Sequence, residues 1–387
     1  MNKFYASLKE LFSSPSLIPP GVYHYQSPPT ADEQYRLHLR IEEDGHGLLI
    51  INAATVLHLN QTAAEYAYHI IRQTPEDEVV RIVSNRYETE SDQILKDFYE
   101  FKTKIQTMIE MPDLDPVHYL DIDRTKPYAG AITAPYRMDC ALTYRLPEDR
   151  NPDLAPTRRV DRELTTEEWK TILDKAWEAG IPHVTFTGGE PTLREDLMDL
   201  ITYAEKKGQV TGLLSDGFRF SEDNFFQDLL LTGLDHLMFA LTPLRERSWA
   251  VLQKTLKEDI YTTVHITIHP TFVQHLEGMI TNLKELGANA LSLSVSSPHD
   301  PALDRALKNA RTHAAEIGLP LKWDIPVPYS AHNPVAMEVE AKETPKGAGK
   351  AWIYVEPDGD VLPSQGDNRI LGNLLHDPWD EVWSNRP

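Results

Sequence analysis

The chain of 387 residues contains only one cysteine, Cys140. A single cysteine cannot form an internal disulfide, and it excludes zinc sites that are built from several cysteines. It also removes the set of thiolates that an iron–sulfur centre requires. We therefore expect no metal chemistry that rests on sulfur ligands from this chain.

Positive charge is scarce as well. Lysine and arginine number 38 against 59 aspartates and glutamates, so the formal net charge at pH 7 is −21. Because nucleic acids are bound through a basic face, we expect no nucleic-acid partner. The first residues show no signal-peptide pattern, and no stretch reaches the roughly 18 apolar residues that a membrane span needs. The sequence thus predicts a cytoplasmic protein that does not bind membranes.

The first third of the chain predicts a small α+β domain over residues 35–110. Leu37, Leu39 and Ile41 alternate with polar residues, which is typical of a half-buried strand. Two more strands and then three helices follow, and Asn60 is a suitable N-cap for the first helix. The expected strands cover 35–42, 48–52 and 55–59, and the expected helices begin near residues 62, 75 and 91. We treat residues 1–34 as an arm and residues 111–135 as a linker.

Strands and helices alternate from residue 136 onwards. The expected strands are Ala141–Tyr144, His183–Thr187, Thr211–Leu214, His236–Ala240, Val264–Ile268 and Ala290–Val295. Such repeated β/α units predict a parallel sheet. Their spacing alone leaves open both a partial barrel and a doubly wound layer. We assign residues 136–330 to this domain and residues 331–387 to a shorter C-terminal segment.

Candidate ligand-binding residues follow the strand His183–Thr187. Gly188, Gly189, Glu190 and Pro191 come directly after it, where the carboxyl ends of parallel strands collect ligands. Glycines let the backbone approach a ligand closely, and a glutamate accepts hydrogen bonds from an ammonium group. This strand and motif resemble the nucleotide-binding signature of radical S-adenosylmethionine (SAM) enzymes.

The resemblance implies a fold and a set of site residues. It favours an open (β/α)6 partial barrel of radical SAM type, in which the Gly-Gly-Glu motif holds the amino group of SAM. Two later segments are similar to further parts of that site, Leu214–Gly217 and Ala240–Pro243, although an ordinary turn from strand to loop is the alternative for both. The cofactor-binding residues implied are Gly188, Gly189, Glu190, Pro191, Ser215, Asp216 and Thr242.

The iron–sulfur ligands of that family are absent. The run Ala141–Arg145 resembles the strand that precedes the family's Cys-x3-Cys-x2-Cys loop. Continuing in the same register, the three cysteine positions hold Leu146, Arg150 and Asp153, none of which offers a thiolate. Cys140 lies six residues too early, and we interpret it as a buried apolar residue. The resemblance thus implies a radical SAM body without its [4Fe–4S] cluster.

The C-terminal segment departs from its family in the same way. Lys346–Gly349 and Val355–Ser364 resemble the SPASM or twitch extension of peptide-modifying radical SAM enzymes, with Lys346 and Ser364 at cysteine positions. The Pro357-Asp358-Gly359 turn is a feature that forms without a metal. We expect a degenerate extension over residues 331–387 that holds no metal.

Residues 35–110 are similar to the PqqD-like RiPP recognition element, a winged-helix-like domain that binds precursor peptides. The stretch His58–Ala63 carries the resemblance most closely. In that family a leader peptide adds to the edge of the sheet as a further strand. A docking domain without a peptide ligand is the alternative, whereas a DNA-binding wing conflicts with the acidic charge.

Three functions remain open at this point. The favoured hypothesis is a pseudoenzyme in peptide maturation, which binds a precursor peptide or a partner maturation enzyme and keeps SAM as a ligand. The second is an enzyme with non-radical chemistry, whose acid–base groups are Glu190, Asp216, His265 and Lys322. The third is a radical enzyme whose cluster a partner supplies. His265 and His269 share one side of a strand, and buried core histidines are the alternative to a ligand role there.

Overall fold

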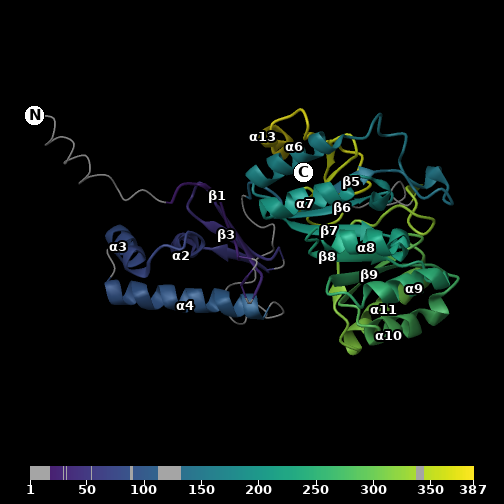
Figure 1. Cartoon of the computed structure of the whole chain (residues 1–387), viewed down its shortest axis with the longest axis horizontal. Coiled ribbons are helices and arrows are strands. Elements are labelled where there is room, and N and C mark those ends of the chain that lie inside the picture. The colour runs from purple at the N-terminus through teal and green to yellow at the C-terminus, as the bar shows by residue number, and fades with distance from the viewer. Residues whose placement is uncertain are drawn as a thin grey trace, which may run out of the picture. The chain divides into compact units, whose positions relative to one another are not determined.

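The computed structural model in Figure 1 divides the chain into two compact units, Met1–Thr133 and Ala134–Pro387. The residues that it describes are 18–28, 30–31, 33–53, 55–87, 90–111, 132–336 and 344–387. Most of the expected linker over 111–135 lies outside them, as does half of the expected arm over 1–34. Each unit is described by itself.

The N-terminal unit is built on an antiparallel sheet of four strands in the order β1-β2-β3-β4. The strands are β1 (Gly21–Gln26), β2 (Arg36–Ile41), β3 (Gly47–Ile51) and β4 (Thr55–Leu59). Three of them match the sequence-based expectation. The fourth, β1, pairs with β2 along its whole length, although we had placed its residues in an arm.

The described residues of this unit also form three helices, α2 (Gln61–Ile71), α3 (Glu76–Tyr87) and α4 (Ser91–Glu110). The side chain of Asn60 accepts a hydrogen bond from the backbone of Ala63 at 2.9 Å, so the expected N-cap is confirmed. Apolar residues of β2, β3 and β4 pack against α2 and the end of α4 in one core, while α2, α3 and α4 enclose a second core around Phe98.

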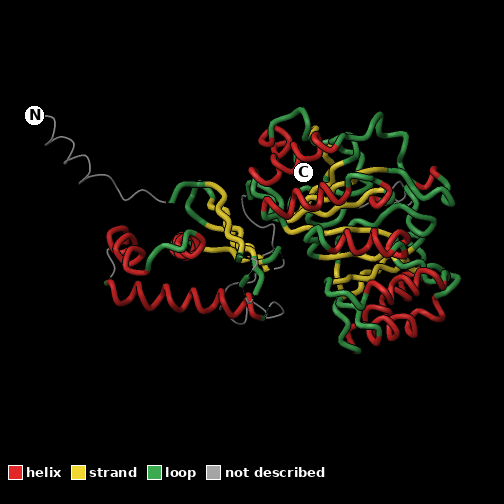
Figure 2. Tube along the Cα trace, viewed as in Figure 1, coloured by secondary structure: helices red, strands yellow, loops and turns green. Residues whose placement is uncertain are grey.

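The C-terminal unit contains a sheet of ten strands in the order β11-β10-β9-β8-β7-β6-β5-β12-β13-β14. Figure 2 shows these strands side by side, with helices packed against them. The strands are β5 (Arg137–Thr143), β6 (His183–Gly188), β7 (Val210–Ser215), β8 (His236–Ala240), β9 (Tyr261–Ile268), β10 (Ala290–Val295), β11 (Leu321–Lys322), β12 (Trp352–Val355), β13 (Asp360–Leu362) and β14 (Gly372–Asn373).

The helices of this unit lie between successive strands. They are α6 (Thr166–Glu178), α7 (Leu197–Lys207), α8 (Asp223–Leu230), α9 (Glu246–Thr255), α10 (Leu276–Glu285), α11 (Pro301–Glu316) and, after the last strand, α13 (Trp379–Ser384). At the start of α6, Thr165 and Glu168 form the expected capping box, and Trp169 is fully buried behind it. Within the described residues, no helix is long and apolar enough to cross a membrane.

Strand order separates the two architectures that spacing left open. From β5 to β10, each strand pairs in parallel with the next strand along the chain. A doubly wound sheet reverses its strand order within the β/α repeat, whereas the strands from β5 to β11 keep one order. The unit is therefore an open partial barrel, and all six β/α units present their carboxyl ends on the same side.

The C-terminal segment adds to the barrel on its first edge. Strand β12 pairs in parallel with β5, and β13 and β14 continue the sheet as antiparallel strands. The hydroxyl of Tyr144, just after β5, donates a hydrogen bond to buried Glu356 at 2.8 Å. Arg159 pairs with the other oxygen of Glu356 at 3.2 Å. Hydrogen bonds and apolar packing hold this extension on the barrel.

Candidate functional site

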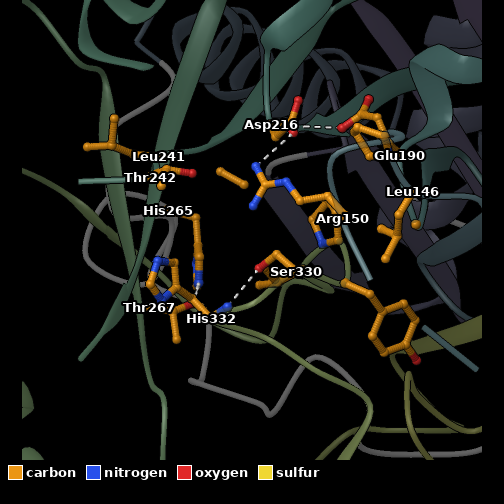
Figure 3. A pocket seen from close by; sticks show the side chains of 16 residues that line it. Leu146, Arg150, Glu190, Asp216, Leu241, Thr242, His265, Thr267, Ser330 and His332 are labelled. Carbon is orange, nitrogen blue, oxygen red and sulfur yellow. Dashed lines mark hydrogen bonds and ion pairs between the residues drawn. The ribbon is translucent and has the colours of Figure 1, made fainter. Parts of the chain in front are cut away.

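A cavity that is partly open to solvent lies at the carboxyl ends of the strands. Figure 3 shows the side chains that line it. They are Leu146, Pro147, Arg150, Gly189, Glu190, Asp216, Ala240, Leu241, Thr242, His265, Thr267, Val327, Pro328, Tyr329, Ser330 and His332.

The glycine pair is fixed by its packing against the end of β5. Gly188 has a φ of +131°, and a Cβ atom there would lie 2.1 Å from the backbone oxygen of Thr143. A Cβ on Gly189 would lie 2.2 Å from the backbone oxygen of Arg145. The backbone N–H groups of Gly189 and Glu190 donate to these same two oxygens, at 2.7 and 2.9 Å. Only glycine fits so close an approach of two backbones.

The carboxylate of Glu190 is buried and is held by four donors. Its Oε1 accepts hydrogen bonds from the backbone and hydroxyl of Thr192, at 3.1 and 2.6 Å, and from the hydroxyl of Ser215 at 2.8 Å. Its Oε2 accepts from the backbone N–H of Asp216 at 2.9 Å. Burial and the nearby Asp216 carboxylate raise the pKa of Glu190 to about 8, although the donors oppose this shift.

Arg150 and Asp216 face one another across the cavity (Figure 3). The Nη2 atom of Arg150 lies 3.7 Å from Oδ2 of Asp216, and its Nε lies 3.5 Å from Oδ1 of Asp149. The other oxygen of Asp216 accepts from the backbone N–H of Phe218 at 2.9 Å. Asp216 is thereby fixed in position, and it brings negative charge beside the Arg150 guanidinium.

His265 extends from β9 into the floor of the cavity. Its Nδ1 lies 3.0 Å from the hydroxyl of Ser292, and its Nε2 lies 3.2 and 3.0 Å from those of Thr267 and Ser294. Burial lowers the pKa of His265 to about 4, so the imidazole is neutral at physiological pH. Both nitrogens have hydroxyl partners, which fits a satisfied core histidine.

Residues between β11 and β12 cover part of the cavity. The backbone N–H of Tyr329 donates to the oxygen of Gly188 at 3.3 Å, and that of Val335 donates to the oxygen of Leu154 at 2.8 Å. His332 lies in the same segment, and its pKa is lowered by burial and by the positive charges of His269, Arg150 and Arg245. Sequence reasoning missed this segment because it lacks periodicity; the proline pair Pro326 and Pro328 was its main signal.

Comparison with known proteins agrees with this architecture. Residues 140–259 match the family model of the radical SAM superfamily. They form a radical SAM domain. A PqqA peptide cyclase from Streptomyces rochei is 28% identical over 291 residues, which cover 65% of this chain and 76% of that protein.

Two crystal structures of one Streptococcus suis protein share the fold. SuiB bound to S-adenosylmethionine is 14% identical with a TM-score of 0.58, over 90% of this chain and 86% of that one. SuiB bound to precursor peptide SuiA gives the same identity and TM-score over 89% and 86%. The partial barrel of radical SAM type predicted from the sequence is thus confirmed.

The radical SAM domain brings together most of the expected site residues. Gly189, Glu190, Asp216, Thr242 and His265 all line the cavity. Four others do not line it: Gly188, Pro191, Ser215 and Lys322. The first three lie behind the cavity wall and support it, Ser215 through its hydrogen bond to Glu190.

Lys322 is the expected acid–base residue that the fold separates from the rest. Its Nζ lies 5.7 Å from the ring centroid of Tyr261, which begins β9 at the amino-terminal edge of the sheet. Glu190 and His265, in turn, have partners on all their polar side-chain atoms. Glu190 and His265 are therefore already engaged in hydrogen bonds within the protein, and Lys322 lies outside the cavity. None of the three is available in the cavity as a proton donor or acceptor for a substrate.

The residues that the sequence resemblance assigns to the family's cluster positions do not offer the thiolates of an iron–sulfur cluster. Leu146 and Arg150 line the cavity, and neither an isobutyl group nor a guanidinium binds iron. Asp153 is an exposed residue paired with Arg158 at 3.9 Å. Cys140 is fully buried within β5, as expected, and burial raises the pKa of its thiol well above the usual value.

The two positions in the C-terminal extension fit a cluster no better. Lys346 is exposed and Ser364 is buried, and neither side chain offers a thiolate. Across the described residues, no group of three or more histidine, cysteine, aspartate or glutamate side chains is arranged to hold a metal ion.

Proposed function

We propose that this protein binds a precursor peptide, or the enzyme that matures it, on a radical SAM scaffold that carries no iron–sulfur cluster. One observation carries the proposal: Gly189 and Glu190 line the same cavity as Leu146 and Arg150, the two residues that the sequence resemblance assigns to cluster positions. A reductive reaction needs electrons that thiolate-bound iron supplies. A scaffold without such ligands retains binding as its function.

The N-terminal sheet supports a role in peptide binding. Strand β4 ends the strand order, so its outer edge pairs with no other strand among the residues that the structure describes. Half-buried Val56 and His58 alternate in it with buried Leu57 and Leu59. A peptide that adds beside β4 would gain backbone hydrogen bonds, and SuiB, which shares the fold, has been crystallised with a precursor peptide.

SAM, or a compound related to it, is the proposed ligand of the cavity. Asp216 offers a carboxylate to an ammonium group, and Thr242 offers a hydroxyl. When bound here without a cluster, SAM supplies no radical and acts as a structural ligand. Isothermal titration of the purified protein with SAM tests this part, and the absence of both heat and a shift in melting temperature would reject it.

The absence of a cluster is tested by anaerobic reconstitution. The protein is incubated with iron, sulfide and dithiothreitol, desalted, reduced with dithionite in the presence of SAM, and examined by EPR. We expect no [4Fe–4S] signal and no 5′-deoxyadenosine. Either product from this chain alone rejects the pseudoenzyme. A signal that arises only with a co-purified partner assigns the cluster to that partner.

Peptide binding is tested in two stages. Mass spectrometry of material that co-purifies with the full chain identifies a candidate peptide, and a synthetic copy is then titrated against the pure protein. Hydrogen–deuterium exchange locates the binding edge: we expect slower exchange in β4 and no change in β1, the opposite edge of the sheet. A synthetic peptide that fails to bind rejects the peptide function. Protection of β1 alone would reject β4 as the edge.

A further inference from the structure

Arg150 is a cationic group inside the cavity that no described contact satisfies fully. Its side chain is 11% exposed, and its Nε is buried without a hydrogen-bond partner. Asp149 and Asp216 approach its nitrogens only to 3.5 and 3.7 Å. Charge-assisted hydrogen bonds are usually about 2.7–2.9 Å long. The guanidinium is therefore electrostatically paired, yet it retains donors for another acceptor.

Burial makes such donors valuable to a ligand. A guanidinium presents five N–H donors in a planar fork that matches the two oxygens of a carboxylate. In a partly desolvated cavity, an anion that bonds to it directly replaces long contacts with short ones. Burial has already removed most of the water around Arg150. A carboxylate that binds there therefore displaces little water from the guanidinium, and the desolvation penalty of binding is smaller.

Acceptors lie beside these donors in the same cavity. Asp216 faces Arg150, and Glu190 lies next to Asp216 through the hydrogen bond from the Asp216 backbone (Figure 3). Donors for an anion and acceptors for a cation are thus adjacent. An α-amino acid group, with a carboxylate and an ammonium on one carbon, has this complementary arrangement.

We propose that Arg150 binds the α-carboxylate of the ligand while Asp216 accepts from its α-ammonium, so that the cavity selects SAM-type compounds by their amino-acid end. This inference rests on the ligand part of the proposed function. It gives Arg150 a role at a position where the family resemblance implies a cluster cysteine. The guanidinium of Arg150 then binds the carboxylate of the ligand.

The experiment compares two adenosine compounds that differ in the carboxylate alone. SAM and decarboxylated SAM, which keeps the amine and the sulfonium, are titrated calorimetrically against the wild type and Arg150→Met. We expect the wild type to bind SAM about 10- to 100-fold more tightly than decarboxylated SAM, as for one hydrogen-bonded charge pair. In Arg150→Met this ratio should fall to about 1–3.

Arg245→Met is the matched control. Arg245 pairs with Asp149 at 3.3 Å, as Arg150 does at 3.5 Å, but it is 47% exposed and does not line the cavity. The substitution Arg245→Met also removes one positive charge near Asp149. We expect it to leave the ratio of the affinities for SAM and decarboxylated SAM at the wild-type value. Arg150→Lys keeps the charge without the fork, and we expect an intermediate ratio.

Three results would overturn the inference. Arg150→Met could keep the wild-type ratio, the wild type could bind both compounds equally, or Arg245→Met could lower the ratio as much as Arg150→Met. If the melting curve shows that Arg150→Met does not fold, the affinity ratios of the wild type and of Arg150→Lys test the inference instead. An Arg150→Lys ratio equal to that of the wild type would then overturn it. If no adenosine compound binds while the synthetic peptide does, this inference and the ligand fail, whereas the peptide function stands.

Discussion

The loops that follow β5 and β6 both border the cavity, yet they are built differently. After β6, the residues from Gly188 to Thr192 are all buried, and the backbones of Gly189 and Glu190 are bonded to the end of β5. After β5, the residues from Glu148 to Asp153 are mostly exposed, and their backbone bonds are local turns.

This difference bears on what a retained motif means. The Gly-Gly-Glu residues are required by the packing of β6 against β5, whether or not a ligand binds. At the positions that the resemblance assigns to cluster cysteines, Leu146 packs against the apolar cluster around Tyr144 and Arg150 pairs with Asp216, so neither residue needs a thiolate for its contacts. A motif that also serves as structure is therefore weaker support for a ligand than its match to a family implies.

The largest expected effect is that of Gly188→Ala. The new Cβ would lie 2.1 Å from the oxygen of Thr143, at a backbone φ that alanine rarely adopts. We expect a loss of about 3–5 kcal/mol in the free energy of unfolding, measured with urea. Gly278→Ala in α10, where the Cβ meets nothing within 4 Å, should instead stabilise the protein by about 0.5–1 kcal/mol. Equal stability of the two variants would mean that the packing of Gly188 against Thr143 does not require a glycine.

Glu190→Gln tests the β6 loop through pH. Because the folded protein raises the pKa of Glu190 to about 8, the native state binds more protons than the unfolded state between about pH 4.5 and 8. The stabilisation is thus present at low pH and is lost as pH rises through this window. Relative to Glu190→Gln, the wild type should lose on the order of 2–4 kcal/mol between pH 5 and 8. Parallel stability curves for the two proteins would contradict this expectation.

His265→Gln should show the opposite dependence. Burial lowers the pKa of His265 to about 4, so the unfolded state binds more protons between about pH 4 and 6.5. Relative to the variant, wild-type stability should rise by about 1–3 kcal/mol from pH 4 to 6.5 and then stay level. Urea unfolding across this range measures the difference. A wild type that gains nothing over the variant would mean that the imidazole is not desolvated.

The smallest effect is expected at Tyr144, where the β5 loop begins. Its hydroxyl is buried against Glu356, so Tyr144→Phe leaves one carboxylate oxygen short of a donor. The expected loss in unfolding free energy is about 1–2 kcal/mol. Tyr203→Phe removes a hydroxyl that bonds to partly exposed Asp174, and it should change stability by less than about 0.5 kcal/mol. Similar losses in both variants would show that burial of the Glu356 contact adds nothing.

The sequence predicted the positions of the strands better than it predicted which strands pair with one another. All six barrel strands were found from their apolar runs, because each run is bounded by a helix or a turn. The edge strand β1 was missed, since its half-exposed alternation, Val22, Tyr23, His24 and Tyr25, is short and lies within a polar stretch. The pairing of β12 with β5 joins distant parts of the chain, which no local pattern encodes.

The site was predicted in the same uneven way. Glu190, Asp216 and Thr242 follow directly from strand ends, and the fold brings them together in the cavity. Arg150 was identified only as a residue unable to bind iron, because a charged side chain in a loop is usually solvated. Asp216, with which it pairs, lies far away in the sequence. Lys322 does not line the cavity, contrary to the hypothesis that it is an acid–base group there. Its place at a strand does not determine in which direction so long a side chain extends.

The pairing of β12 with β5 also has a consequence during synthesis. Strand β5 emerges from the ribosome first among the barrel strands, but its outer edge is covered only by residues 352–355. Until then, a nascent chain presents an apolar strand with open backbone groups, which is a template for intermolecular association. Chaperone dependence and losses to inclusion bodies should therefore increase sharply when translation is halted before Trp352.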